Sequence, residues 1–159
     1  MTLALTAEPR YLSDRDVDRR YQAPIASSAT SNVTELREWR LRRDREIVVQ
    51  QVEQLRALAH GWDGEQGKVP ALVSIDYAYR VVLDLLAQSV MRPSIVPVSD
   101  GGVTIEWHRG VRQLVLYVPP RDEPVLANYL DEASGEEWEG ELPADARLVE
   151  DQLGAFRAV

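Results

Sequence analysis

Four side chains in the sequence have the chemistry of a hydrolytic or ligand-binding site: His60, Asp63, Glu106 and His108. An imidazole beside a carboxylate can hold and transfer a proton near neutral pH, which is what general acid-base catalysis requires. Glu106 and His108 are two residues apart, so on a β-strand both would lie on the same face and could share a ligand or a proton. One hypothesis is therefore a small-ligand-binding or hydrolytic protein that uses this cluster. It requires the four groups to converge in one pocket.

The other sequence signals of chemistry are absent. The chain contains no cysteine, so it has no disulfide, no thiolate nucleophile and no thiolate metal site. Two histidines without a thiol make a poor ligand set for zinc, and the sequence has neither a phosphate-binding loop nor a Gly-x-Ser-x-Gly motif. Glu106 and His108 are also typical of a surface pair beside a hairpin turn. We therefore expect no cofactor, no metal and no catalytic residue.

Length and charge limit the class of protein. A chain of 159 residues with 45% hydrophobic residues is long enough for one domain with its own core. The formal net charge of -8 opposes binding to nucleic acids and to anionic membranes, because both are negatively charged. No apolar run reaches the roughly 18 residues that suggest a membrane span, and the first residues lack the basic start of a signal peptide. We therefore expect a cytoplasmic protein that does not associate with membranes.

The composition changes near residue 32. Residues 1–31 contain two prolines, a charged run and a small polar stretch without periodicity, which predicts a flexible arm that is extended or disordered. Asn32 and Glu35 then have the spacing of a capping box, which predicts the start of a helix that runs to about His60. Residues 32–156 are predicted to form a single α+β domain.

The two halves of this first helix differ in composition. The C-terminal half has apolar residues at the spacing of a core-facing stripe, from Val48 to Leu58. The N-terminal half alternates five arginines, between Arg37 and Arg45, with acidic residues. This arginine-rich segment is an alternative basis for nucleic-acid binding, but the interleaved carboxylates cancel nearly all of its charge. We therefore expect it to be a solvent-exposed face.

A glycine-rich turn separates the first helix from a second one. Gly61 suits a left-handed helix terminus, Trp62 is expected to fold back on the core, and Asp63 is expected to accept hydrogen bonds from its own turn. Pro70 suits the first turn of a second helix over about 71–90. Two helices joined in this way are expected to pack as an antiparallel pair.

The rest of the chain has the pattern of a sheet. Turn signals divide it into alternating runs that predict a four-stranded antiparallel meander, with strands at about 94–98, 103–108, 112–118 and 125–131. Both helices are expected on its apolar face, where Trp107 helps to close the core. The acidic run after this meander is a candidate fifth edge strand, and a short last helix is predicted from Pro143 to about Phe156.

The predicted register gathers the large aliphatic side chains on one face of the sheet. It assumes a first turn centred on Asp100 and Gly101 and a second centred on Arg109 and Gly110. The predicted pairs are Val98 with Val103, Val96 with Ile105, Ile105 with Leu114, Leu114 with Tyr129, and Arg112 with Asp131.

The other face of this sheet has more apolar residues than a solvent-exposed face needs. We expect it to be covered by residues after 132, or to form an interface with a protein partner or a second copy of the chain. The predicted binding residues on this face are Val115, Tyr117, Leu126 and Leu130, together with Glu106 and His108.

Two motifs, in this order, resemble those of a known group of proteins. The motifs are Gly61-Trp62-Asp63-Gly64, followed by Pro70 at the start of the next helix, and Asp100-Gly101-Gly102-Val103 leading to Ile105-Glu106-Trp107. They are similar to the pattern of a family of small, largely uncharacterised bacterial proteins, over roughly residues 45–130. The resemblance implies an α+β fold and transfers no catalytic residue to this chain.

These observations favour a non-enzymatic protein-interaction module of a bacterial cytoplasm, with a regulatory, immunity or antitoxin-like, or assembly role. The hypothesis rests on the missing catalytic motifs, on the two-sided sheet and on chain ends that can order on a partner. A protein partner or homo-oligomer is expected, and nucleic acid is not.

Overall fold

The computed structural model describes residues 25–88 and 90–157, with side chains from residue 32 on. The predicted arm falls largely on residues 1–24, which lie outside the described residues. The chain from Trp39 on forms one compact unit, and the arrangement described below is that of this unit. No helix among the described residues is long and apolar enough to cross a membrane.

Helix α2 spans Ile25–Arg56, so the predicted helix start is wrong. The predicted capping box at Asn32 and Glu35 lies inside the helix. The sequence between Ile25 and Asn32 contains no proline or glycine, so nothing there interrupts a helix that has begun earlier. Residues 32–40 are exposed, as expected for the arginine-rich segment, and the guanidinium of Arg43 lies 5.4 Å from the ring centre of Trp39.

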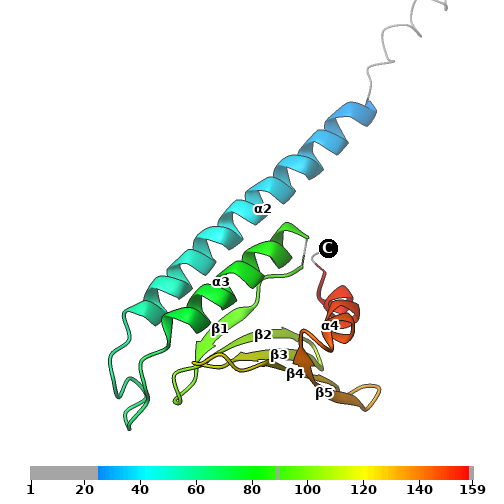
Figure 1. Cartoon of the computed structure of the whole chain (residues 1–159). Coiled ribbons are helices and arrows are strands. Elements are labelled where there is room, and N and C mark those ends of the chain that lie inside the picture. Colours follow the sequence, from blue (N-terminus) through cyan, green and yellow to red (C-terminus); the bar gives the residue numbers. More distant parts are fainter. Residues whose placement is uncertain (1–24, 89, 158–159) are drawn as a thin grey trace, which may run out of the picture. The chain divides into compact units, whose positions relative to one another are not determined.

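Helix α3 spans Leu72–Ala87 and packs beside the C-terminal half of α2 (Figure 1). Near the end of α2, Arg56 makes a 2.8 Å ion pair with Asp76 in the first turns of α3, as expected for an antiparallel pair. The prediction that α3 continues to Val90 is wrong, because Val90 leaves the helix and bridges Arg157 near the end of the chain. The residues of α3 that are buried are Ser74, Ile75, Ala78, Val82 and Leu86.

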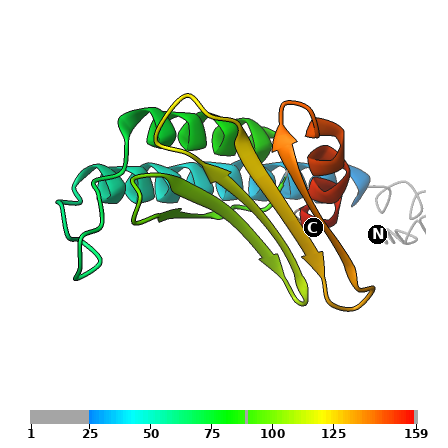
Figure 2. The same ribbon diagram turned by 60° about the horizontal axis from the view of Figure 1, so that its bottom comes forward.

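Five strands form one antiparallel sheet in the order β1-β2-β3-β4-β5, so the predicted α+β meander is confirmed and the candidate fifth strand is present (Figures 1 and 2). A short helix, α4, and a 3-10 turn, η1, follow the sheet. The bounds are Ser94–Pro97 for β1, Val103–Arg109 for β2, Arg112–Val118 for β3, Val125–Asp131 for β4, Glu136–Leu142 for β5, Ala146–Leu153 for α4 and Gly154–Phe156 for η1.

The register of β3 and β4 is as predicted, with Leu114 opposite Tyr129 and Arg112 opposite Asp131. The register of β2 and β3 differs by two residues, because the turn is centred on Gly110 and Val111 and pairs Ile105 with Leu116. A shift of two residues keeps every side chain on its predicted face.

The register of β1 is wrong by one residue. The prediction paired Val96 with Ile105, whereas Ile95 occupies that position and Val96 faces the other side of the sheet. The cause is a turn with one residue fewer than expected: the Val98 N–H donates a 3.0 Å hydrogen bond to the carbonyl of Gly102, whereas the predicted register set Val98 opposite Val103, and Gly101 has φ +96°. A backbone in that region favours glycine, so the second residue of the Asp-Gly-Gly motif makes the tighter turn accessible.

One core joins the helices to the inner face of the sheet. Trp107 is fully buried in it and donates a 2.9 Å hydrogen bond from Nε1 to the carbonyl of Met91. Phe156 closes the same core from the end of the chain, and its carbonyl accepts a 2.8 Å hydrogen bond from the Met91 N–H. Val149 and Leu153 of the last helix belong to the same core, so this segment lies on the inner side of the sheet, and β5 extends the outer face without covering it (Figure 2).

Candidate functional site

The outer face of the sheet is the set of outward-pointing side chains of β1 to β5. None of them is buried, since each is half-buried or exposed. The face carries four glutamates and one histidine but no lysine or arginine. Its members are Ser94, Val96, Thr104, Glu106, His108, Gln113, Val115, Tyr117, Leu126, Asn128, Leu130, Glu137, Glu139 and Glu141.

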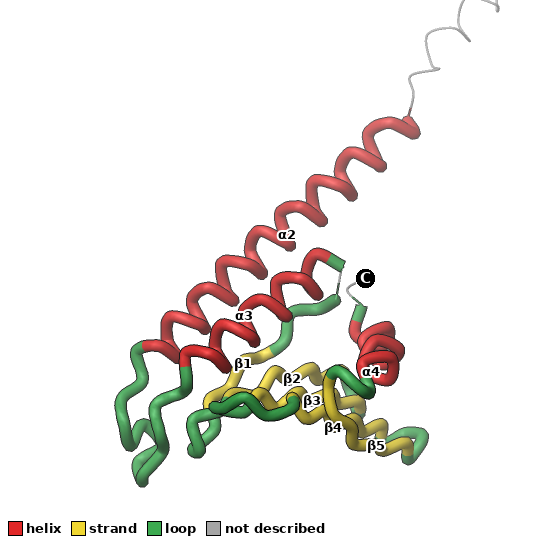
Figure 3. The backbone as a smooth tube through the Cα atoms, in the orientation of Figure 1, coloured by secondary structure: helices red, strands yellow, loops and turns green. Residues whose placement is uncertain are grey.

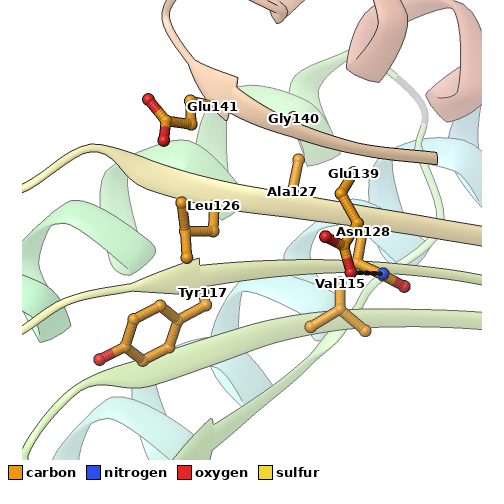
Figure 4. A pocket seen from close by; sticks show the side chains of 8 residues that line it. All are labelled: Val115, Tyr117, Leu126, Ala127, Asn128, Glu139, Gly140 and Glu141. Carbon is orange, nitrogen blue, oxygen red and sulfur yellow. Dashed lines mark hydrogen bonds between the residues drawn. The ribbon is translucent and has the colours of Figure 1, made fainter.

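A hollow on this face, here called the outer groove, lies over β3, β4 and β5 (Figure 4). Its volume is about 420 Å³, within the range of sites that bind small molecules or side chains. Leu126 stands in it with 46% of its surface exposed, so a large aliphatic side chain is available to a ligand. The residues that line the groove are Val115, Tyr117, Leu126, Ala127, Asn128, Glu139, Gly140 and Glu141.

The acidic rim of the outer groove comes from β5. Pairing of β5 with β4 places Glu141 beside Leu126 and Glu139 beside Asn128. The amide of Asn128 donates a long, 3.4 Å hydrogen bond to Glu139 Oε1. The backbone N–H of Glu141 donates to Asp145 Oδ2 at 2.8 Å, and Gly140 allows this contact because a Cβ there would lie 2.8 Å from the same oxygen. The end of β5, and with it the rim, is therefore held in place.

Tyr117 closes the other end of the outer groove. Its hydroxyl donates a short hydrogen bond to Asp100 Oδ2 in the turn between β1 and β2. Burial, with the Asp100 carboxylate as the next cause, raises the pKa of Tyr117 to about 12, because both disfavour the phenolate. The other oxygen of Asp100 accepts a 2.8 Å hydrogen bond from the N–H of Gly102. A Cβ on Gly102 would lie 2.7 Å from the Tyr117 ring, so this glycine makes room for the ring.

A second hollow, the turn pocket, begins on the far side of Tyr117. Its volume is about 370 Å³, and Tyr117 lines both hollows. The loop between α2 and α3 (green in Figure 3) forms one wall, since its Lys68 N–H donates to the Ser99 carbonyl at 2.8 Å. The residues that line the turn pocket are Lys68, Val69, Asp100, Gly101, Tyr117, Pro120, Arg121 and Glu123.

Glu106 and His108 form the surface pair that the sequence suggested. His108 Nε2 lies 3.3 Å from Glu106 Oε2, and the Thr104 hydroxyl donates to Glu106 Oε1 at 2.7 Å. These groups lie on the outer face but do not line the outer groove.

Asp63 serves its own loop. Its Oδ1 accepts hydrogen bonds from the N–H groups of Glu65 at 3.0 Å and Gly67 at 2.9 Å, and these bonds lower the pKa of the carboxyl. Within the described chain, no hydrogen bond or ion pair joins His60 or Asp63 to Glu106 or His108. The described residues also contain no cluster of three histidine, aspartate or glutamate side chains able to hold a metal ion.

Trp62 departs from its predicted role. Its Nε1 donates a 3.0 Å hydrogen bond to the Lys68 carbonyl, and its half-buried ring is not part of the core. The indole therefore braces the loop between α2 and α3. The Gly-Trp-Asp motif and the Asp-Gly-Gly motif meet through this loop, because Lys68 and Ala71 bond to Ser99 and Gly101 of the β1–β2 turn.

Three of the eight residues that line the outer groove are among the predicted binding residues. Val115, Tyr117 and Leu126 line it, whereas Leu130 shares the outer face outside the groove. The acidic rim was missed. Its signal is the alternation of glutamate with other residues from Glu137 to Glu141, which becomes a row on one face once the run is taken as a strand beside β4.

Comparison of the chain with models of protein families, with curated proteins and with solved structures finds no match.

Proposed function

We propose that the protein is a non-enzymatic protein-interaction module that binds its partner at the outer groove. The observation that carries this proposal is an open hollow on one face of the sheet with an apolar floor, formed by Val115 and the exposed Leu126. Exposed apolar side chains gathered in a hollow are typical of binding surfaces. A regulatory, immunity or antitoxin-like, or assembly role in a bacterial cytoplasm belongs to the same proposal.

Hydrogen bonds already hold one end of the groove, which favours binding with little rearrangement. Tyr117 is held by Asp100, and Asp100 is held by the Gly102 N–H. Side chains already fixed before binding lose less conformational entropy when a partner arrives. The surface is therefore suited to a partner that docks on a preformed shape.

A site-specific crosslinking experiment tests this function. A photoreactive amino acid replaces the half-buried Asn128 in the outer groove, and in a control chain it replaces Leu72, a more accessible site on α3 that is 65% exposed. Illumination in cells of the source organism is expected to produce a discrete protein adduct from position 128 and none from position 72. The same adduct is expected to disappear when Leu126→Asp is added, because a charge on the groove floor opposes apolar docking.

Two results would contradict the proposal. One is the absence of any protein adduct from position 128, and the other is an identical adduct pattern from both positions. Either would show that the groove has no protein partner of its own.

A further inference from the structure

The outer face of the sheet is acidic. Its glutamates are Glu106, Glu137, Glu139 and Glu141, and no lysine or arginine points outward from any of the five strands. Two of them, Glu139 and Glu141, stand at the rim of the outer groove. A partner therefore meets a negative potential directly beside an apolar floor.

The rim carboxylates are available to a cation. Among the described residues, no side chain donates a hydrogen bond to Glu141, and Glu139 receives only the long contact from Asn128. Both side chains are exposed, so both carboxylates are hydrated and neither belongs to a buried ion pair. A basic group of a partner would not have to displace an existing ion pair.

The spacing of these groups limits the chemistry of the partner. Glu139 and Glu141 lie two residues apart on the same face of one strand, which separates them by about 7 Å. Leu126 lies directly opposite Glu141 across the strand pair, at a side-chain separation of about 5 Å. A ligand side chain that packs against Leu126 and a ligand cation that pairs with a rim carboxylate must therefore come from neighbouring positions of the ligand.

A second copy of the chain fits this surface poorly. A two-fold interface brings the same patch of both subunits together, so it would set one acidic rim against the other without a basic side chain from the outer faces. The net charge of -8 adds long-range repulsion. Nucleic acids are disfavoured at this face for the same reason.

We propose that the outer groove binds a basic segment of a partner protein, in which an arginine or lysine stands next to an aliphatic or aromatic residue. The apolar residue packs on Val115 and Leu126, beside the Tyr117 ring, and the cation pairs with Glu139 or Glu141. This proposal rests on the proposed function and specifies the partner's chemistry at the same site.

Selection from a random-peptide display library tests the proposal with a defined probe. The full-length protein is the bait, and the Leu126→Asp variant removes peptides that bind elsewhere. The enriched peptides are expected to carry arginine or lysine within about two residues of an aliphatic or aromatic side chain, the distance over which one extended segment spans floor and rim. Enrichment of neutral or acidic peptides, or of none, would overturn the proposal.

Charge reversal of the rim provides the quantitative arm. Binding of an enriched peptide to Glu139→Arg/Glu141→Arg is expected to be at least about tenfold weaker, and raised salt is expected to weaken binding to the wild type. The control, Asp84→Arg/Glu150→Arg, makes the same change in net charge at exposed sites on α3 and α4 and is expected to bind within about twofold. Equal weakening in both variants would show that only net charge matters and would overturn the proposal.

The milder variant Glu139→Gln/Glu141→Gln separates loss of binding from loss of folding. It is expected to weaken peptide binding without altering the thermal melt. Failure of these arms leaves the proposed function intact, because crosslinking at position 128 reports any protein partner, whatever its charge.

Discussion

The Tyr117 hydroxyl on β3 donates a hydrogen bond to Oδ2 of Asp100 in the turn between β1 and β2. The same carboxylate accepts the N–H of Gly102 through its other oxygen, at 2.8 Å. The Asp-Gly-Gly motif therefore does more than turn the chain, because it also positions the aromatic ring that separates the outer groove from the turn pocket.

The titration of Tyr117 tests this link. A phenol with a pKa of about 12 is expected in an absorbance titration of the folded protein and is expected to be missing from Tyr117→Phe. Because burial is the first cause of the raised pKa, Asp100→Asn is expected to lower the value only in part.

The raised pKa of Tyr117 also determines how the free energy of unfolding changes at high pH. The folded state holds the phenolic proton more tightly than the unfolded state, so this contribution is complete below pH 10 and is lost as the pH rises towards 12. Urea unfolding at several pH values is expected to show a smaller loss for Tyr117→Phe than for the wild type over this window. An equal loss in the two proteins would contradict the assignment.

Gly102→Ala is expected to destabilise the fold by about 1–3 kcal/mol, because the new Cβ would lie 2.7 Å from the Tyr117 ring and 2.8 Å from the Val118 carbonyl. The matched control is Gly154→Ala. Nothing lies within 4 Å of a Cβ there, and the backbone is helical at φ -56°, so the change is expected to be neutral or to stabilise by up to about 1 kcal/mol. Chemical denaturation of both variants measures the change in the free energy of unfolding, which is expected to fall for Gly102→Ala and not for Gly154→Ala.

Ser74 is a fully buried polar residue on the core face of α3, and its hydroxyl donates a 2.6 Å hydrogen bond to the Pro119 carbonyl. Ser74→Ala is expected to cost about 1–3 kcal/mol, because it leaves that buried carbonyl without its donor. Ser94→Ala, at the exposed start of β1, is expected to stay within about 0.5 kcal/mol. Unfolding free energies that do not differ between the two variants would argue against a structural role for this bond.

Asp131 makes a contribution to the stability of the fold that depends on pH. Arg112 Nε donates to its Oδ2 at 2.7 Å, and this bond lowers the pKa of the carboxyl below its ordinary value of 3.8. Its stabilising effect is therefore complete above that value and is lost as the pH falls through the lowered folded-state pKa.

Asp131→Asn is accordingly expected to be less stable than the wild type at pH 7, with a difference that narrows as the pH falls below 3.8. Asp84→Asn, at an exposed site on α3, is expected to remain close to the wild type throughout. Thermal melts across this pH range measure both differences, and a constant difference for Asp131→Asn would contradict the link to Arg112.

The apolar alternation of the sequence determined which residues share a face of the sheet. Leu114 opposite Tyr129 and Arg112 opposite Asp131 could be predicted, because long strands with one apolar face tolerate few registers. The same alternation placed Val115, Tyr117 and Leu126 together on the outer face. These are local properties, set by the two-residue period of a strand.

Tertiary structure alone decided the rest. Turns of three or four residues are both compatible with Asp-Gly-Gly, and in the three-residue turn that forms, Gly102 lies against a ring from β3. The acidic rim likewise exists only because β5 pairs with β4, which sets Glu141 beside Leu126. A hollow and its charge are properties of side chains that are distant in sequence, so no periodicity along the chain contains them.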